Sequence, residues 1–329
     1  MSSLIATTLA TISAIMFGTY SVIQAAIIKE LLRTQGRNDK LSQEFTAGWL
    51  QAIVFVGASL LTFIFLLVSI FIMGIEEFLH IFGSLYIDIV IIIVLILIHF
   101  GVNYIVILAI FRESISRIFA LVTYSPVFAT IIAFALLGES VTMFQAITII
   151  ICLAGLSLVM DPRYYIRESN ILNLLMMLAI PIIFGLQNTL FKSILIHAMQ
   201  EINTSKIDVA GLISVVSIIN IMIFTATFAL AFILTLIMKL EQPGKKKYNV
   251  DNLTIIKVFL SGLIFAIGSI TSFLALNIQK VALVVTIITM QSIIPILYGA
   301  LRLGEKISLN MMIGIIIALA GVIALTCIA

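Results

Sequence analysis

Uncharged polar side chains recur inside long apolar segments of this sequence, at matching places in its two halves. Tyr20 and Ser21 correspond to Gln187 and Asn188, Asn103 corresponds to Ser269, and Ser125 corresponds to Gln291. Because an unbonded polar group is costly in apolar surroundings, these side chains should face one another inside the protein. Such groups can bind a solute by hydrogen bonds, and hydrogen bonding between helices alone is the alternative role.

The predicted substrate-binding set adds polar neighbours of these pairs. It comprises Tyr20, Ser21, Gln24, His99, Asn103, Tyr104, Tyr124, Ser125, Gln187, Asn188, Ser269, Thr271, Ser272 and Gln291. Because the set contains no acidic side chain, it favours a neutral or zwitterionic metabolite. The spacing of residues indicates no catalytic residues, no metal ligands and no cofactor motif, and Cys152 and Cys327 are interpreted as apolar packing.

The segments that carry these residues are predicted to cross a membrane. Of the 329 residues, 62% are hydrophobic and only 10% are charged, which excludes a soluble enzyme, a disordered chain and a nucleic-acid-binding domain. A bilayer core of ~30 Å needs about 20 apolar residues in a helix. Ten segments fit: 4–28, 46–73, 87–111, 115–137, 141–160, 170–191, 209–238, 254–277, 281–301 and 307–327. The first is interpreted as a membrane helix and not as a cleaved signal peptide.

The two halves of the sequence share short motifs at a nearly constant offset of 166 or 167 residues. The matched pairs are Phe17-Gly18 with Phe184-Gly185, Leu108-Ala109-Ile110 with Leu274-Ala275-Leu276, Leu137-Gly138-Glu139 with Leu303-Gly304-Glu305, and Leu153-Ala154-Gly155 with Leu319-Ala320-Gly321. Each half carries five predicted spans, so the second half must enter the membrane from the opposite side. The sequence therefore predicts an all-α polytopic membrane protein of two inverted-topology repeats, residues 1–163 and 168–329.

This organisation resembles the EamA-like branch of the drug/metabolite transporter superfamily. The resemblance rests on the ten spans, the paired halves and the ending of each half, in which a helix with Pro126 or Pro295 leads to Leu-Gly-Glu and a closing helix with Leu-Ala-Gly. It implies a substrate cavity lined by the first, third, fourth, sixth, eighth and ninth spans. Small multidrug-resistance proteins of that superfamily use a membrane-embedded Glu in their first helix, and this sequence lacks it.

The expected function is secondary transport of a small organic metabolite by alternating access, through facilitated diffusion or exchange, without enzymatic activity. The alternatives are a non-transport membrane scaffold or receptor and a proton-coupled drug or metabolite exporter. The expected partners are the small-molecule substrate and the lipid bilayer, with no nucleic acid, for a monomer or homodimer. Substrate identity and the membrane stay open.

Two further expectations concern the motif residues and the orientation. Glu139 and Glu305 are interpreted as turn residues at helix junctions, with Thr142 and Gln145 forming a capping box and Ser308 in the equivalent cap position. Pro126, Pro181 and Pro295 are expected to bend their helices. Of the 18 Lys and Arg residues, 15 lie in alternate connectors, which places those connectors in the cytoplasm and both termini outside. The resembled family usually has cytoplasmic termini, so the orientation stays open.

Overall fold

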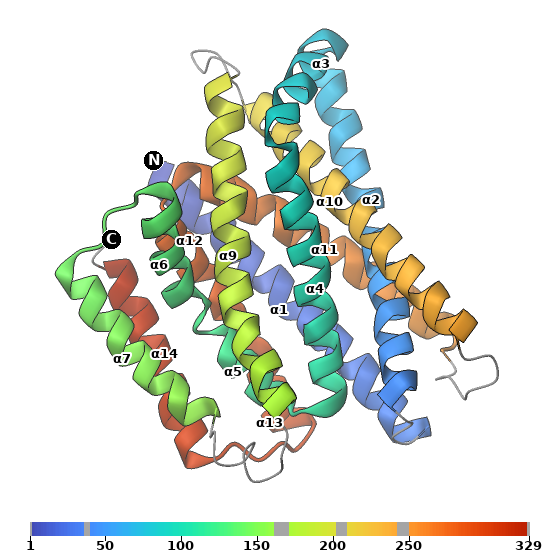
Figure 1. The fold of residues 1–329 in the computed structure, drawn as a ribbon, viewed down its shortest axis with the longest axis vertical. Helices are drawn as coiled ribbons and strands as arrows, with labels where there is room; N and C mark the ends of the chain where they lie inside the picture. Colours follow the sequence, from blue (N-terminus) through green and yellow to red (C-terminus); the bar gives the residue numbers. More distant parts are fainter. Residues whose placement is uncertain (1, 36–39, 161–170, 202–208, 242–249, 328–329) are drawn as a thin grey trace.

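All regular elements that the computed structural model describes are helices, within residues 2–35, 40–160, 171–201, 209–241 and 250–327 (Figure 1). In the first half they are α1 (Ser2–Gln35), α2 (Lys40–Met73), α3 (Ile75–Ser84), η1 (Leu85–Asp88), α4 (Ile89–Arg112), α5 (Ile115–Val122), α6 (Ser125–Leu137) and α7 (Met143–Met160). In the second half they are α9 (Ile171–Glu201), α10 (Val209–Glu241), α11 (Asn252–Ile278), α12 (Val281–Thr289), η2 (Met290–Ser292), α13 (Ile293–Arg302) and α14 (Leu309–Cys327). Helices satisfy their own backbone hydrogen bonds, as apolar surroundings require.

Eight of the predicted spans are long and apolar enough in the described residues to cross a membrane, which makes the chain a multi-pass membrane protein. The other two predicted spans, the fifth and the tenth, correspond to α7 and α14, where the apolar stretches Met143–Gly155 and Leu309–Gly321 are shorter. The segment between the second and third predicted spans, residues 74–86, contains the helix α3. The sequence analysis did not predict it, because its ten residues are too few to cross a membrane.

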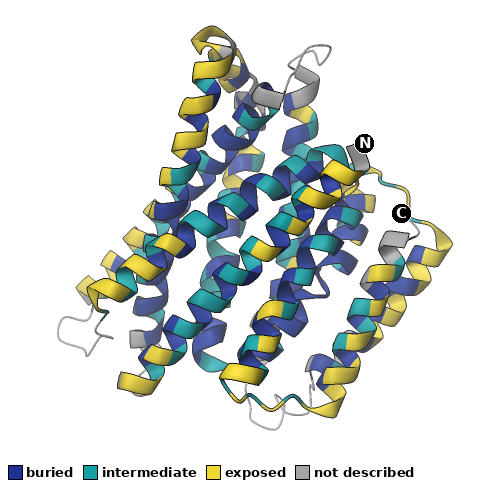
Figure 2. Ribbon diagram, turned by 180° about the vertical axis from the view of Figure 1, so that it is seen from behind, coloured by how far each residue is buried: buried dark blue, intermediate teal, exposed yellow. Residues whose placement is uncertain are grey.

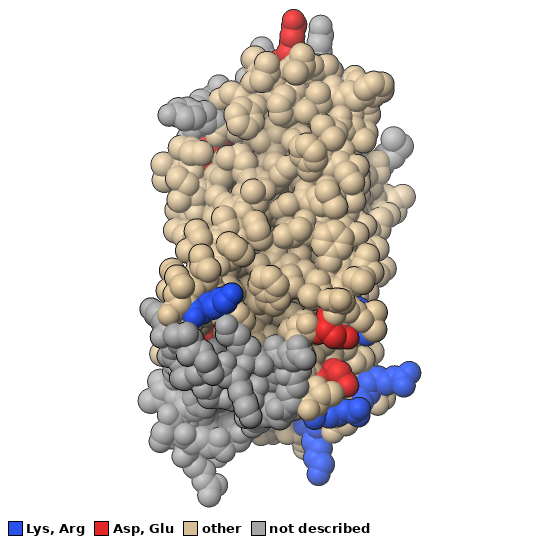
Figure 3. Space-filling model, turned by 90° about the vertical axis from the view of Figure 1, so that its right-hand side faces the viewer, with Lys and Arg blue, Asp and Glu red and all other residues tan. Residues whose placement is uncertain are grey.

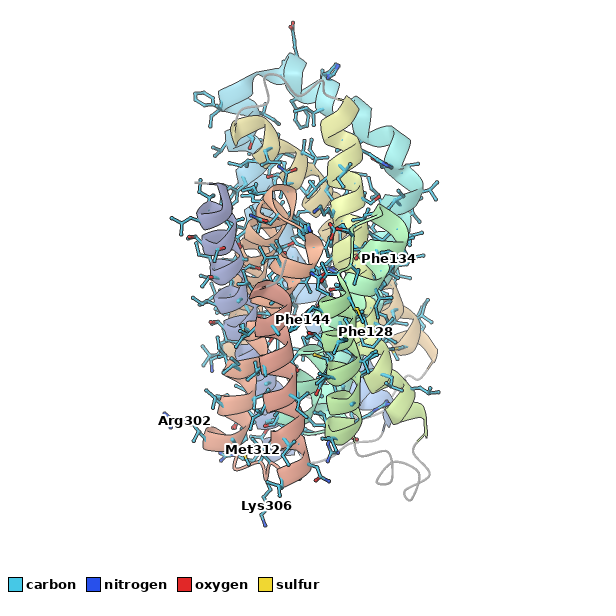
Figure 4. All side chains as sticks on the ribbon, turned by 90° about the vertical axis from the view of Figure 1, so that its left-hand side faces the viewer. Phe128, Phe134, Phe144, Arg302, Lys306 and Met312 are labelled. Carbon is cyan, nitrogen blue, oxygen red and sulfur yellow. The ribbon has the colours of Figure 1, made fainter. Side chains whose placement is uncertain are left out.

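The outer surface is apolar around its middle and charged near its ends. Large apolar side chains such as Phe71, Phe134 and Phe144 are exposed. Figure 2 shows that exposed residues lie along the outward faces of the helices. Figure 3 shows charged side chains gathered mainly at one end of the molecule, below a broad uncharged surface. In Figure 4, Arg302 and Lys306 lie at that same end, away from the level of Phe134 and Phe144. This distribution is what a bilayer around the middle of the molecule requires.

The elements of the two halves pack against each other across the molecule. α2 packs along α10 and α7 packs along α14, on opposite sides of the ribbon in Figure 1. Between these pairs, α1 packs against α11, while α4 and α6 pack against α9. The centre is therefore enclosed by α1, α4, α9 and α11 together with the helices of the fourth and ninth spans.

The fourth and ninth spans are each interrupted near their middle. α5 ends at Val122 and α6 begins at Ser125, whereas the 3-10 turn η2 joins α12 to α13. Pro126 occupies the first turn of α6, where its missing N–H is not needed, and Pro295 lies in the first turn of α13. Pro181 lies inside α9, which continues on both sides of it. Two of the three prolines thus mark breaks at the centre of the molecule.

The predicted helix caps are confirmed. The Thr142 N–H donates to Oε1 of Gln145 (2.8 Å), and the Gln145 N–H donates to Oγ1 of Thr142 (3.2 Å), which is a capping box at the start of α7. At the equivalent start of α14, the Met311 N–H donates to Oγ of Ser308 (3.2 Å). Because these side chains already cap α7 and α14, Glu139 and Glu305 are available for other contacts.

Candidate functional site

A cavity lies at the centre of the molecule, where the breaks in the fourth and ninth spans meet α1, α4, α9 and α11. Its volume open to the centres of water molecules is about 70 Å³. A cavity that holds a single water needs about 10–15 Å³ of space, so this cavity is larger than a single-water site. That space suits a small organic solute.

Ten of the fourteen predicted site residues line this cavity. They are Tyr20, Ser21, His99, Asn103, Ser125, Gln187, Asn188, Ser269, Ser272 and Gln291. They come from six separate stretches of the chain, which only the tertiary structure brings together. That these residues bind a substrate stays a prediction.

The structure places the other four predicted residues outside the cavity lining, and each makes a hydrogen bond there. Gln24 donates to Oγ of Ser261 (2.7 Å), and the hydroxyl of Tyr124 donates to the Gly314 carbonyl (2.7 Å). The Tyr104 hydroxyl lies 3.4 Å from the Glu44 carbonyl. The Thr271 hydroxyl donates to a carbonyl of its own helix, that of Ile267 (2.9 Å).

Sequence reasoning missed Thr289 and the apolar residues of the lining, because it selected polar residues in apolar segments. Six phenylalanines belong to the lining: Phe17, Phe119, Phe184, Phe191, Phe265 and Phe273. The repeat contained a usable signal, since Phe17 and Phe184 already stood in matched motifs, and Phe265 lies 166 residues after His99. Each residue that lies 166 or 167 positions from a predicted polar site residue could also have been predicted to line the cavity, even where it is apolar.

The lining is paired between the two halves of the sequence. Each lining residue from the first half has a lining residue 166 or 167 positions later, which gives nine pairs. The pairs are Phe17/Phe184, Tyr20/Gln187, Ser21/Asn188, His99/Phe265, Asn103/Ser269, Val106/Ser272, Phe119/Val285, Val122/Ile288 and Ser125/Gln291. The remaining lining residues are Phe191, Phe273 and Thr289. The same repeat that orders the sequence therefore orders the cavity wall.

His99 and Gln187 form a hydrogen bond across the two halves. Nε2 of the Gln187 amide lies 2.8 Å from Nδ1 of His99. Because this amide nitrogen can only donate, Nδ1 accepts and the ring proton sits on Nε2. Oε1 of Gln187, Nε2 of His99 and Oγ of Ser125 are buried without a hydrogen-bond partner. Buried polar atoms without partners are costly, and at a cavity wall they point to a missing ligand or water.

The glutamates of the two Leu-Gly-Glu motifs bind the starts of helices in the opposite half. Oε1 and Oε2 of Glu305 accept from the N–H groups of Ile115 and Ser116 at the start of α5, each at 2.9 Å. Oε1 of Glu139 accepts from the Val281 N–H at the start of α12 (3.3 Å). A carboxylate at a helix N-terminus also interacts favourably with the helix dipole. The interpretation of both residues as local turn residues was therefore incomplete.

Two lysines, one on α1 and one on the corresponding helix α9, also donate hydrogen bonds at these junctions. Lys192 donates to Oε1 of Glu139 (3.0 Å) and to the Gln279 carbonyl (2.8 Å) just before α12. Lys29 donates to the Glu113 carbonyl (3.0 Å) just before α5. We call the junction of Glu305, Glu113 and Lys29 the Glu305 end of the cavity, and the junction of Glu139, Gln279 and Lys192 the Glu139 end.

The repeated glycines allow close approach at equivalent places. A Cβ at Gly18 would lie 2.6 Å from the Ile294 side chain of α13, and one at Gly185 would lie 2.7 Å from the Ala129 nitrogen of α6. Only glycine lets α1 and α9 come this close to the interrupted spans of the opposite half. Gly138 and Gly304 adopt φ values of 65° and 66°, which turn the chain toward Glu139 and Glu305.

No protein-family model matches this chain, and no curated protein matches it either. Within the residues that the structure describes, no group of three or more His, Cys, Asp or Glu side chains is placed to hold a metal ion.

Proposed function

We propose that this protein is a secondary transporter of a small organic solute, built from two inverted five-helix repeats and working by alternating access. The observation that carries the proposal is the central cavity, whose wall is contributed pairwise by the two halves and contains buried polar atoms without partners. A membrane scaffold does not require an internal cavity of this kind for its function. The membership suggested by the sequence resemblance, in the drug/metabolite transporter superfamily, is part of this proposal.

The directions of the helices support the inverted arrangement. In Figure 1, α1 runs from the upper end of the molecule downward, whereas its counterpart α9 runs upward. The contacts are also reciprocal, because Glu305 of the second half binds the start of α5 and Glu139 of the first half binds the start of α12. An axis in the membrane plane that exchanges the halves would exchange these two contacts. Such symmetry is the basis of alternating access in inverted-repeat transporters.

The two glutamate junctions are suited to serve as gates. Each joins a short helix of one half to the end of an interrupted span of the other, and both short helices, α5 and α12, lead directly to the cavity. Breaking one junction while keeping the other would let the solute exchange with one side only. Charge-assisted hydrogen bonds at partly exposed positions are strong enough to hold a gate and weak enough to open it.

The test begins with purified protein in detergent. A thermal-shift screen against a metabolite library should identify compounds that raise the unfolding midpoint, because ligands of the folded state stabilise it. A labelled hit should then accumulate by counterflow in liposomes that contain the protein. Asn103→Leu and Gln187→Leu should abolish both effects while leaving the folded yield unchanged. Thr271→Val is the matched control, since Thr271 lies outside the cavity and should keep both.

A stabilising compound that never moves across the liposome membrane would contradict transport and favour a receptor. Wild-type uptake by Asn103→Leu and Gln187→Leu would contradict the site.

A further inference from the structure

We propose that the cavity takes an uncharged solute that carries N–H or O–H donors next to an apolar ring or face. This inference rests on the proposed function, because it names the class of solute that the same cavity would bind. It follows from which hydrogen-bonding atoms of the wall are already engaged, and from where the phenylalanines lie.

Three polar side chains of the cavity wall each use a donor on a backbone carbonyl of the protein. Nδ2 of Asn103 donates to the His99 carbonyl (2.8 Å), and Nδ2 of Asn188 donates to the Phe184 carbonyl (2.7 Å). Ser21, the counterpart of Asn188, donates to the equivalent Phe17 carbonyl (2.8 Å). Because a carbonyl can only accept, these assignments do not depend on how the amide is oriented. Each of the two asparagines keeps Oδ1, an acceptor, together with the second N–H of its amide.

Ser269 and Gln187 also use donors within the protein. Oγ of Ser269 donates to Oδ1 of Asn220 on α10 (2.7 Å), and Asn220 in turn donates to the Val216 carbonyl (2.9 Å). The hydroxyl proton of Ser269 is thereby directed away from the cavity. Gln187 uses its Nε2 on His99 and has Oε1 buried without a partner. At these positions the wall offers acceptors, so a solute that carries donors would complete the hydrogen bonds.

The wall contains no full charge. None of the residues that line the cavity is Asp, Glu, Lys or Arg. At the break before α6, the Tyr124 N–H donates to the Leu121 carbonyl (3.0 Å) and the Val127 N–H donates to the Tyr124 carbonyl (3.1 Å). Neither an anion nor a cation would meet a counter-charge in the wall, so either would lose hydration without full compensation. The zwitterion that the sequence left open is disfavoured for the same reason.

Aromatic rings lie on both sides of the acceptor groups. Phe265 packs against Phe17 and Tyr20, with ring centroids 5.2 and 4.9 Å away. Phe273 packs against Phe191, with centroids 3.9 Å apart. Phe265 and Phe273 are separated by eight residues of α11, or about 12 Å along the helix, with Ser269 midway between them. A solute at the acceptors would therefore contact apolar rings above and below.

Four probes of nearly one size test the inference by thermal shift of the purified wild-type protein. Benzamide is uncharged, carries two N–H donors and has an apolar ring. N,N-dimethylbenzamide lacks the donors, benzoate is an anion and benzamidinium is a cation. Benzamide should raise the unfolding midpoint by about 2–4 °C at a concentration near ten times its Kd. The other three should give less than half that shift. No shift with benzamide, or an equal shift with any of the other three, would overturn the class.

Variants show whether the benzamide effect comes from this cavity. Asn188→Leu removes one acceptor and should abolish most of the benzamide shift, whereas Thr271→Val should leave it intact. If Asn188→Leu fails to fold, Asn103→Leu provides the same measurement from the other half of the chain. A benzamide shift that survives in both acceptor variants would place its binding elsewhere and overturn the inference.

The outcomes separate this inference from the proposed function. A transported solute that is anionic would overturn the solute class and leave transport intact. A benzamide shift in a protein that moves no solute across liposomes would support the class and contradict transport.

Discussion

The two ends of the central cavity are made from the same repeated motifs, yet their contacts differ. At the Glu305 end, one carboxylate accepts from two backbone N–H groups at 2.9 Å. At the Glu139 end, the carboxylate accepts from one backbone N–H at 3.3 Å and forms an ion pair with Lys192 at 3.0 Å. The first junction depends on backbone geometry, whereas the second depends on a side chain that ions can screen.

The helices next to the cavity show the same asymmetry. Toward the Glu305 end, Gly262 of α11 touches the Val54 carbonyl of α2, and Gln24 bonds Ser261 across α1 and α11. At the positions equivalent to Gly262 and Gln24, the other half has Ile96 and Phe191. Phe191 lines the cavity, next to Lys192 of the Glu139 end. The cavity thus extends toward the Glu139 end and is closed more tightly toward the Glu305 end.

The comparison shows how a repeated sequence can produce an asymmetric state. The contacts that both halves share, through Leu-Gly-Glu and Phe-Gly, set the common architecture. The residues that differ, such as Gly262 against Ile96, decide which end packs more tightly. Changes at the two ends should therefore have unequal effects on stability.

The largest effect is expected from Gly262→Ala at the Glu305 end. The added Cβ would collide with the Val54 carbonyl and lie 3.2 Å from the Ala58 nitrogen, so α2 and α11 would have to separate. Overpacking of this kind costs about 1–3 kcal/mol, and a backbone collision belongs at the upper limit. Reversible unfolding in mixed detergent micelles measures the change. Gly101→Ala in α4 is the control, because a Cβ there meets nothing within 4 Å. Equal stability of the two variants would contradict the tight packing.

Glu305→Ala should rank second. It leaves the N–H groups of Ile115 and Ser116 without their acceptor and should lower the free energy of unfolding by about 2 kcal/mol. Glu305→Gln keeps one acceptor oxygen and should recover about half of that loss. The same unfolding assay gives both values. If Glu305→Ala and Glu305→Gln are equally destabilised, the two backbone bonds are not what holds this end.

The ion pair at the Glu139 end should contribute less and should respond to salt. Glu139 and Lys192 have side chains that are 16% and 14% exposed. A double-mutant cycle with Glu139→Gln and Lys192→Met should give a coupling energy of about 1 kcal/mol at low salt. Raising the ionic strength to ~1 M should reduce this coupling, while leaving the Glu305→Ala effect nearly unchanged. A coupling that is insensitive to salt would remove the distinction between the two ends.

The smallest effect concerns the start of α11, the helix that carries Gly262. The carboxylate of Asp251 accepts from the Thr254 N–H (3.1 Å), and this hydrogen bond lowers the pKa of Asp251. Because the folded-state pKa is below the unfolded one, this stabilisation is complete above the unfolded pKa and is lost as the pH falls through the folded pKa. Thermal midpoints of wild type and Asp251→Ala should therefore differ slightly at pH 7 and converge toward pH 3. A difference that does not shrink in acid would exclude the cap as its cause.

Parts of the cavity could be predicted because hydrocarbon penalises unbonded polar groups. Asn103, Ser269 and Gln187 were identified from their polarity and their matching positions in the two halves, and all three line the cavity. The same rule selected Tyr124 and Gln24, whose polar atoms bond to Gly314 and Ser261 on other helices. Polarity shows that a side chain needs a partner, but it does not show whether that partner is a helix or a solute.

The sequence by itself determined eight long apolar helices and the caps of α7 and α14, since these depend on composition and on local spacing. Only the tertiary structure decided that Glu139 and Glu305 bind helices of the opposite half, and that Phe265 shares the cavity wall with His99. Those contacts join residues far apart in the chain, so they depend on how the helices cross. Whether a Cβ fits at Gly262 likewise depends on how close the backbones of α2 and α11 come, and the identity of one residue does not reveal that distance.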